Sequence, residues 1–121
     1  MSTALKRRTQ LFAIACGKPC AKFPRGRTFN AYCDQLIRSS ASVGANYRAA
    51  IRGKSDRDFL NKLKIVEEEA DESIYWLEIL EAMSEKEYVQ LKPLKKEANE
   101  LTAIFVASIK TTRARMKRNG K

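Results

Sequence analysis

The sequence predicts an all-α fold, an antiparallel up-and-down four-helix bundle, and three observations lead to this prediction. Only five glycines and three prolines occur in 121 residues, too few for the many turns of a β-sheet protein. Apolar residues recur at spacings of three, four and seven along most of the chain, as they do on one face of a helix. The length, residues 1–121, suits a single domain, which the turn-forming residues divide into four segments joined by short connections.

The first helix is expected at residues 3–18, and a loop with two prolines and a glycine, at 19–27, ends it. The second helix is expected at 28–52. Its centre, residues 39–45, consists almost entirely of small side chains and includes Gly44. A serine-rich phosphate loop is the rival interpretation, but the glycine spacing and the lysine of a P-loop are missing. Because a glycine inside a helix costs about 1 kcal/mol relative to alanine, we interpret Gly44 as the place where another helix approaches closely.

The third helix is expected at residues 56–83, where Ser55 can cap the helix and acidic residues suit its first turn. The fourth helix is expected at 85–118, and residues 84–87 have the pattern of a capping box. Pro93 either kinks this helix or occupies its first helical position.

Residues 101–109 of the fourth helix are apolar or small on every side, and the third helix is crowded in the same way around Trp76. A surface helix of a monomer should be polar on its outer side. We therefore expect a homo-oligomer held together by contacts of the fourth helix. The residues assigned to its interface are Trp76, Ile104, Phe105, Val106 and Ile109.

Histidine is absent, which excludes Ser-His and Cys-His catalysis and histidine-ligated metals. Cys16, Cys20 and Cys33 are an odd number of cysteines in a chain without a recognisable export signal, which favours reduced thiols in the cytoplasm. They also lack the fourth ligand of a zinc tetrahedron. No apolar run reaches the ~18 residues of a membrane span. We expect a cytoplasmic protein with no cofactor, no metal and no membrane contact.

Charge is distributed unevenly along the chain, whose formal net charge is +10. Residues 1–54 carry 11 basic side chains and one acidic, residues 55–92 carry 5 and 11, and residues 93–121 carry 8 and 2. Such asymmetry indicates a surface that binds a polyanion, and nucleic acid is the commonest one. The alternative is that the basic helices pair with the acidic third helix and that the basic tail is a solvated end. The residues assigned to phosphate contacts are Arg25, Arg27, Arg38, Arg48, Arg52, Lys54, Arg113, Arg115, Lys117 and Arg118.

The acidic residues admit a second function. Glu68, Glu69 and Glu72 form an E-E-x-x-E pattern, and Glu97 and Glu100 follow on the next helix. Carboxylates at these spacings share a helix face and can hold Mg²⁺ between antiparallel helices, an arrangement similar to that of all-α nucleotide pyrophosphatases. A solvated acidic face, or ion pairs with the basic helices, explains the same residues without a metal.

Three segments resemble one known family. Their sequences are IRSSASVGANYRAA at 37–50, KLKIVEEEADESIYWLE at 62–78 and ELTAIFVASIKT at 100–111. They are similar to the signature, the third helix and the last helix of the bacterial four-helix-bundle family, also called the 23S rRNA intervening-sequence protein family, whereas residues 1–27 carry no matching motif. The resemblance implies a ring-like homopentamer and supplies no catalytic residues. A distantly similar accessory protein of diversity-generating retroelements binds nucleic acid through a basic pentamer.

The sequence thus predicts a non-enzymatic, oligomeric helical bundle that binds nucleic acid through contacts to phosphates. RNA and DNA both fit this prediction, and structured RNA is favoured. Two alternatives stay open. One is a structural or adaptor bundle that binds a protein partner without nucleic acid. The other is a magnesium-dependent nucleotide pyrophosphatase that uses the five glutamates.

Overall fold

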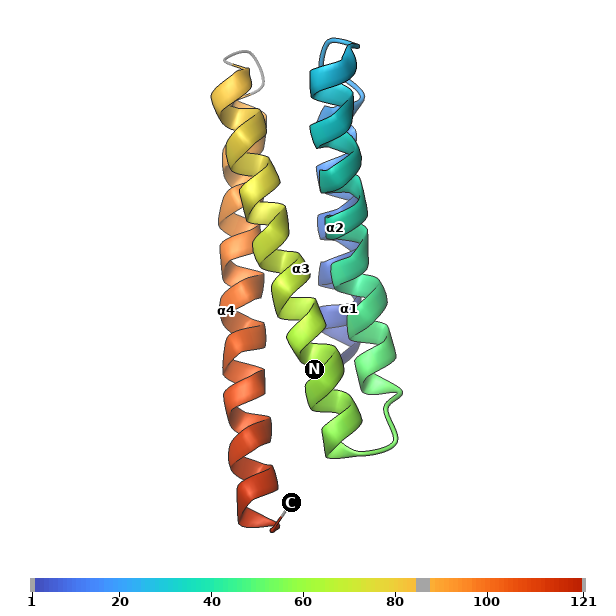
Figure 1. The fold of residues 1–121 in the computed structure, drawn as a ribbon, viewed down its shortest axis with the longest axis vertical. Coiled ribbons are helices and arrows are strands. Elements are labelled where there is room, and N and C mark those ends of the chain that lie inside the picture. Colours follow the sequence, from blue (N-terminus) through green and yellow to red (C-terminus); the bar gives the residue numbers. More distant parts are fainter. Residues whose placement is uncertain (1, 85–87, 121) are drawn as a thin grey trace.

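The structure, a computed structural model, describes residues 2–84 and 88–120, and every regular element within these ranges is an α-helix (Figure 1). Successive helices run in opposite directions along the long axis, so the predicted all-α, antiparallel up-and-down four-helix fold is confirmed. The four helices are α1 (Ser2–Cys20), α2 (Arg27–Ile51), α3 (Asp56–Met83) and α4 (Tyr88–Arg118).

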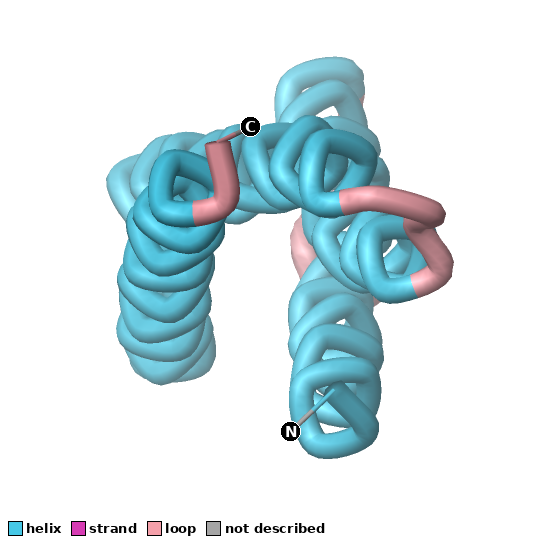
Figure 2. The backbone as a smooth tube through the Cα atoms, turned by 90° about the horizontal axis from the view of Figure 1, so that it is seen from below, coloured by secondary structure: helices cyan, strands magenta, loops and turns pink. Residues whose placement is uncertain are grey.

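The helices pack mainly against their neighbours in sequence. Contacts are most extensive between α2 and α3, then between α3 and α4, and α1 touches α2 far more than it touches α4. Seen end-on, the helices therefore form an arch, with the N-terminus on one arm and the end of the chain beside the other (Figure 2). The outer surfaces of α1 and α3 thus belong to different parts of the molecule.

The helix ends differ from the prediction by a few residues. α1 continues to Cys20 and includes Pro19. A proline at this position removes one backbone donor from the helix, and it does so only in the last turn, one residue before α1 ends. The N–H of Lys22 then donates to the carbonyl of Pro19 at 2.9 Å and closes the end. α2 begins and ends one residue earlier than predicted.

The predicted start of the third helix is confirmed, since the backbone N–H of Asp58 donates to the hydroxyl of Ser55 at 3.1 Å. Residues 85–87, which belong to the predicted capping box and begin the predicted fourth helix, lie outside the described residues. Pro93 lies inside α4, which has already formed at Tyr88, so the hypothesis that it begins this helix is wrong.

A continuous apolar core runs between the helices. Its largest fully buried side chains include Phe12 of α1, Leu36 and Val43 of α2, Leu63 and Leu77 of α3, and Leu101 and Phe105 of α4. The rings of Tyr47 and Phe105 lie 5.6 Å apart between α2 and α4. The small residues that the sequence places in the middle of α2 form part of this packing.

The expected close approach at Gly44 is confirmed. A Cβ atom added there would lie 3.1 Å from the hydroxyl oxygen of Thr9 on α1. Thr9 is fully buried, and its hydroxyl donates to the carbonyl of Leu5 at 2.8 Å. On the other side of α2, the hydroxyls of Ser39 and Ser73 are 2.9 Å apart. Small side chains therefore let α2 lie close to both α1 and α3.

The proposed oligomer interface on the fourth helix needs correction. Phe105 is 0% exposed and Ile109 is 6% exposed, so both side chains are already buried within the single chain and cannot form an interface. Ile104 and Val106 are half-buried, and the outermost positions hold Ala103 and other small residues. The sequence shows that this helix is apolar all round, but it does not show which side meets the core. Trp76 is also half-buried and packs against the core.

Candidate nucleic-acid interface

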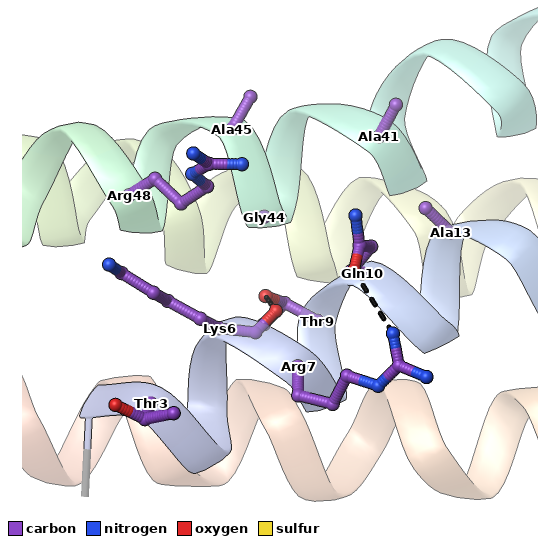
Figure 3. Close-up of a pocket in the computed structure, with 10 residues that line it drawn as sticks. All are labelled: Thr3, Lys6, Arg7, Thr9, Gln10, Ala13, Ala41, Gly44, Ala45 and Arg48. Carbon is purple, nitrogen blue, oxygen red and sulfur yellow. Dashed lines mark hydrogen bonds between the residues drawn. The ribbon is translucent and has the colours of Figure 1, made fainter.

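A groove of about 570 Å³ lies between α1 and α2, beside the contact of Thr9 with Gly44 (Figure 3). Its small side chains come from both helices and leave the space open. Polar and basic side chains surround them. The lining consists of Thr3, Lys6, Arg7, Thr9, Gln10 and Ala13 from α1, and of Ala41, Gly44, Ala45 and Arg48 from α2.

Three cations border this groove. Lys6 extends from α1 into the space between the helices, Arg48 borders that space from α2, and the guanidinium of Arg7 donates to the side-chain oxygen of Gln10 at 3.4 Å (Figure 3). None of the three forms an ion pair with a described residue, in contrast to Arg8 on the next position of α1. α1 contains no acidic residue, and the only one in α2 is Asp34. The groove therefore has a positive potential that no carboxylate in its lining offsets.

A second group of cations gathers at one end of the molecule. The connection between α2 and α3 and the last turns of α4 lie at the same end (Figure 1). Five of the exposed cations there, which we call the basic end, are Arg52, Lys54, Arg113, Lys117 and Arg118. Arg52, the C-cap residue of α2, follows Arg48 by four residues, so the two lie on the same side of α2 and connect the groove with the basic end.

The remaining predicted phosphate ligands lie elsewhere or are already paired. Arg25 and Arg27 are at the opposite end, where α1 connects to α2. Arg38 donates to Glu69 at 2.9 Å and also to Glu72, across the contact of α2 with α3.

Arg115 donates to Asp56 at 3.0 Å and joins α4 to the beginning of α3. We remove Arg38 and Arg115 from the set of phosphate ligands, because carboxylates already engage both guanidinium groups.

The five glutamates of the proposed metal site are not brought together. Glu69 and Glu72 face Arg38 of α2, whereas Glu97 and Glu100 bind Arg8 of α1 at 2.7 and 2.8 Å. Hydrogen bonds from Arg8 to Glu97 raise the pKa of this guanidinium further above its usual value.

Glu68, the fifth, is exposed on α3. The indole N–H of Trp76 donates to Glu72 at 3.1 Å. Among residues 2–84 and 88–120, no three carboxylate or thiol groups are arranged to hold a metal ion. The acidic residues that face arginines therefore serve as ion-pair partners between helices.

The cysteines behave as small, largely buried hydrophobic side chains. Cys16 and Cys33 are buried, Cys20 is half-buried, and all three are free thiols. Burial raises the pKa of the Cys16 thiol to about 12, and it raises those of Cys20 and Cys33 as well. A thiol that stays protonated near neutral pH is a poor nucleophile. In the described part of the chain, no helix has the length and apolar character to cross a bilayer.

Lys6, Arg7 and Gln10 are the site residues that sequence reasoning missed. Their signal is present, since positions 6 and 10 recur at helical spacing on a helix without acidic residues. The sequence does not show which helix packs beside them. Only the fold places this face of α1 against the small residues around Gly44 on α2.

Comparisons with known proteins agree with the fold. The family model described as 23S rRNA-intervening sequence protein matches residues 4–107, which include nearly all of α1, where the sequence alone shows no matching motif. The chain is 29% identical to a structurally similar protein of unknown function from the S23 ribosomal protein family of Bacteroides thetaiotaomicron. That match has a TM-score of 0.74 and covers 87% of this chain and 97% of the other. No curated protein matches the chain.

Proposed function

Because the chain belongs to the 23S rRNA-intervening sequence protein family, a family of small helical proteins, we propose that it binds nucleic acid through contacts to phosphates. Structured RNA is the proposed ligand. In this proposal the protein is not an enzyme and acts in the cytoplasm, which its three free cysteines favour.

The observation that carries this proposal is the separation of paired from unpaired cations. Arg8, Arg38, Lys95 and Arg115 form ion pairs across helix contacts. The three cations of the groove and the five of the basic end form no ion pair with a described residue. Pairing between helices therefore accounts for only part of the positive charge, and these eight cations without an ion pair gather around one end of α2.

The chemistry of the groove fits a phosphate backbone better than a base. Its lining contains no aromatic ring on which a base could stack and no acidic side chain that would repel a phosphate. Lysine and arginine donate charge-assisted hydrogen bonds to phosphate oxygens. Such contacts position a nucleic acid without reading its sequence, so we expect little sequence preference.

The test is the binding of a fluorescently labelled RNA hairpin, measured by anisotropy at several salt concentrations. Each phosphate that the protein neutralises contributes about −0.9 to the slope of log K against log salt on a duplex of the DNA type and about −0.7 on a single strand. We expect a steep slope that corresponds to several neutralised phosphates, and similar affinity for a scrambled hairpin of equal length. Absence of binding at low salt would contradict the proposal and favour the adaptor function.

We further propose that the protein self-associates, as the family resemblance implies with its ring-like homopentamer. Several large apolar side chains on the outer surfaces of α1 and α3 support self-association: Leu11, Ile14, Ile65, Tyr75 and Met83. Repetition of the groove and the basic end in each copy would increase the number of phosphates that the assembly binds. Sedimentation velocity at micromolar concentration tests this, and a single species of the mass of one chain would contradict it.

An adaptor function is the second candidate, because the same exposed apolar side chains also suit a foreign protein. It predicts that mutation of the cations in the groove leaves the biological partner bound. No observation in the described residues favours nucleotide hydrolysis, since the glutamates on which it depends lie on separate helix contacts.

A further inference from the structure

The exposed side of α1 carries an unpartnered apolar surface. Leu11 and Ile14 are 46% and 49% exposed, although they lie in the middle of the helix. Lys18 follows Ile14 by four residues, so the three side chains share one face, away from the buried Phe12. Exposed apolar neighbours of this size on a surface helix are typical of a contact with another molecule.

This surface continues into a shallow depression of about 540 Å³ between α1 and α4. Its lining combines apolar side chains with two lysines and contains no acidic residue. The lining residues are Leu11, Ile14, Ala15, Lys18, Pro19, Lys22 and Leu94. We use the name α1 face for Leu11, Ile14, Lys18 and Lys22, which are apolar at the centre and positive at one end.

The outer side of α3 has the opposite character. Glu68, Asp71, Tyr75 and Glu78 are all exposed, and their spacings of three and four residues place them on one face. We call these four residues the α3 face. It lies opposite the buried stripe of α3, which contains Leu77.

Tyr75 is the centre of the α3 face. Its side chain is 56% exposed, the largest exposure among the large apolar side chains of the described residues. Its ring packs edge-on against Trp76, with 5.0 Å between the ring centroids. A ring held in this way loses little further freedom on binding, and tyrosine is enriched in protein interfaces for this reason.

We propose that the α1 face of one copy docks onto the α3 face of a second copy. In this contact Leu11 and Ile14 cover the ring of Tyr75. Lys18 and Lys22 then lie beside carboxylates of the α3 face. The inference rests on the self-association proposed above and specifies the surfaces that produce it.

A second copy is the occupant because both halves of the contact belong to the same chain. The α1 face is apolar and basic, and the α3 face is aromatic and acidic, so each lacks the charge that the other supplies. Like faces would repel each other: two α3 faces bring six carboxylates together. The contact is therefore heterologous, and successive copies add head to tail until the rotation closes a ring.

Two variants distinguish this contact between unlike faces from a contact between two like faces. Leu11→Asp places a carboxylate on the α1 face, where it meets the acidic α3 face of the next copy. Tyr75→Asp removes the aromatic centre of the α3 face. Both side chains are about half exposed, so each variant is expected to fold. The matched control is Ile37→Asp, which changes an equally exposed apolar residue, 45% exposed, on α2 and outside both faces.

The wild type and the control are expected to sediment as the same multi-subunit assembly, and each of the two variants alone as a single chain of 13.8 kDa. A 1:1 mixture of the two variants is expected to give a heterodimer and nothing larger. In that mixture one intact contact forms between the unchanged α1 face of one variant and the unchanged α3 face of the other, while the second contact carries both changes.

Several results would overturn the inference. Wild-type size for either variant places the interface elsewhere, and a mixture that stays monomeric while circular dichroism shows folded chains excludes the pairing of these two faces. A monomeric wild type contradicts self-association itself. RNA binding is measured on the same samples: wild-type chain that assembles as expected but binds no RNA contradicts the nucleic-acid proposal and leaves this inference standing.

Discussion

Two arginines of α2 provide the sharpest test of the proposed nucleic-acid interface. Arg48 lies at the groove and forms no ion pair with a described residue. Arg38, ten residues earlier on the same helix, donates to Glu69 and Glu72. Both side chains are exposed, so replacement of either by glutamine removes one positive charge from the surface with little change to the core. The two variants have the same net charge and differ only in the position of the missing charge.

The expected magnitude follows from the number of phosphates that each variant can still neutralise. Arg48→Gln neutralises one phosphate fewer, which makes the slope of log K against log salt shallower by about 0.7 to 0.9. If such a contact contributes only through counterion release, with no effect at about 1 M salt, its removal weakens binding roughly 15-fold at 50 mM salt and roughly 4-fold at 200 mM. Arg38→Gln removes no phosphate contact, because carboxylates already hold this guanidinium, so its slope should equal that of the wild type.

The assay is fluorescence anisotropy of an RNA hairpin at five or more salt concentrations, with circular dichroism to confirm that both variants fold. Arg48→Lys serves as a further control, because it keeps the charge and should keep most of the slope. Equal slopes for Arg48→Gln and Arg38→Gln would refute the reasoning. In that case net charge alone, and not the arrangement at the groove, would determine affinity.

Three further predictions concern stability. Gly44→Val forces a side chain against Thr9 and should lower the free energy of unfolding by about 1–3 kcal/mol, and by less in a Thr9→Ala background. Gly17→Val, whose Cβ meets nothing within 4 Å, should not destabilise the protein. Urea titration of the wild type, the three single variants and the double variant checks this. Ser55→Ala removes the helix cap and should cost about 1 kcal/mol in the same titration. The pKa of Cys16 is raised from 9.0 to about 12, so the unfolded chain loses this proton first and stability should fall as pH rises between these values. Thermal melts of the wild type and of Cys16→Ala at several pH values measure how steeply stability falls with pH in each protein. An equally steep fall in both would mean that other groups cause it.

Much of the fold could be predicted from the sequence because its local signals agree with one another. Ser55 and the acidic first turn identify the start of α3, and a glycine among small residues identifies the contact of Gly44 with Thr9. Pro19 is more ambiguous. Its ring is compatible with a last helical turn as well as with a loop, and only the hydrogen bond from Lys22 to its carbonyl shows how the chain leaves the helix.

The candidate site could be predicted less completely because pairing between helices is invisible to local patterns. Arg38 and Arg48 are the same residue type on the same helix, yet the first faces glutamates of α3 and the second borders the groove with α1. Net charge by segment indicates that unpaired cations exist, but it does not indicate which ones they are. Their identity depends on the partner that each helix face receives.

The same reason explains why the sequence points to α4 for the oligomer interface. Residues 101–109 are apolar or small on every side, so they could supply both the core and an interface, but their largest side chain, Phe105, is buried entirely in the core. The exposed positions of this segment are Ala103 and Ala107, which offer a partner little apolar area. Leu11 and Tyr75 are distinguished only by their exposure, since each has an apolar neighbour in the sequence and the fold decides which of the two is buried. Unpartnered side chains of this kind are therefore better evidence for an interface than the total apolar content of a helix.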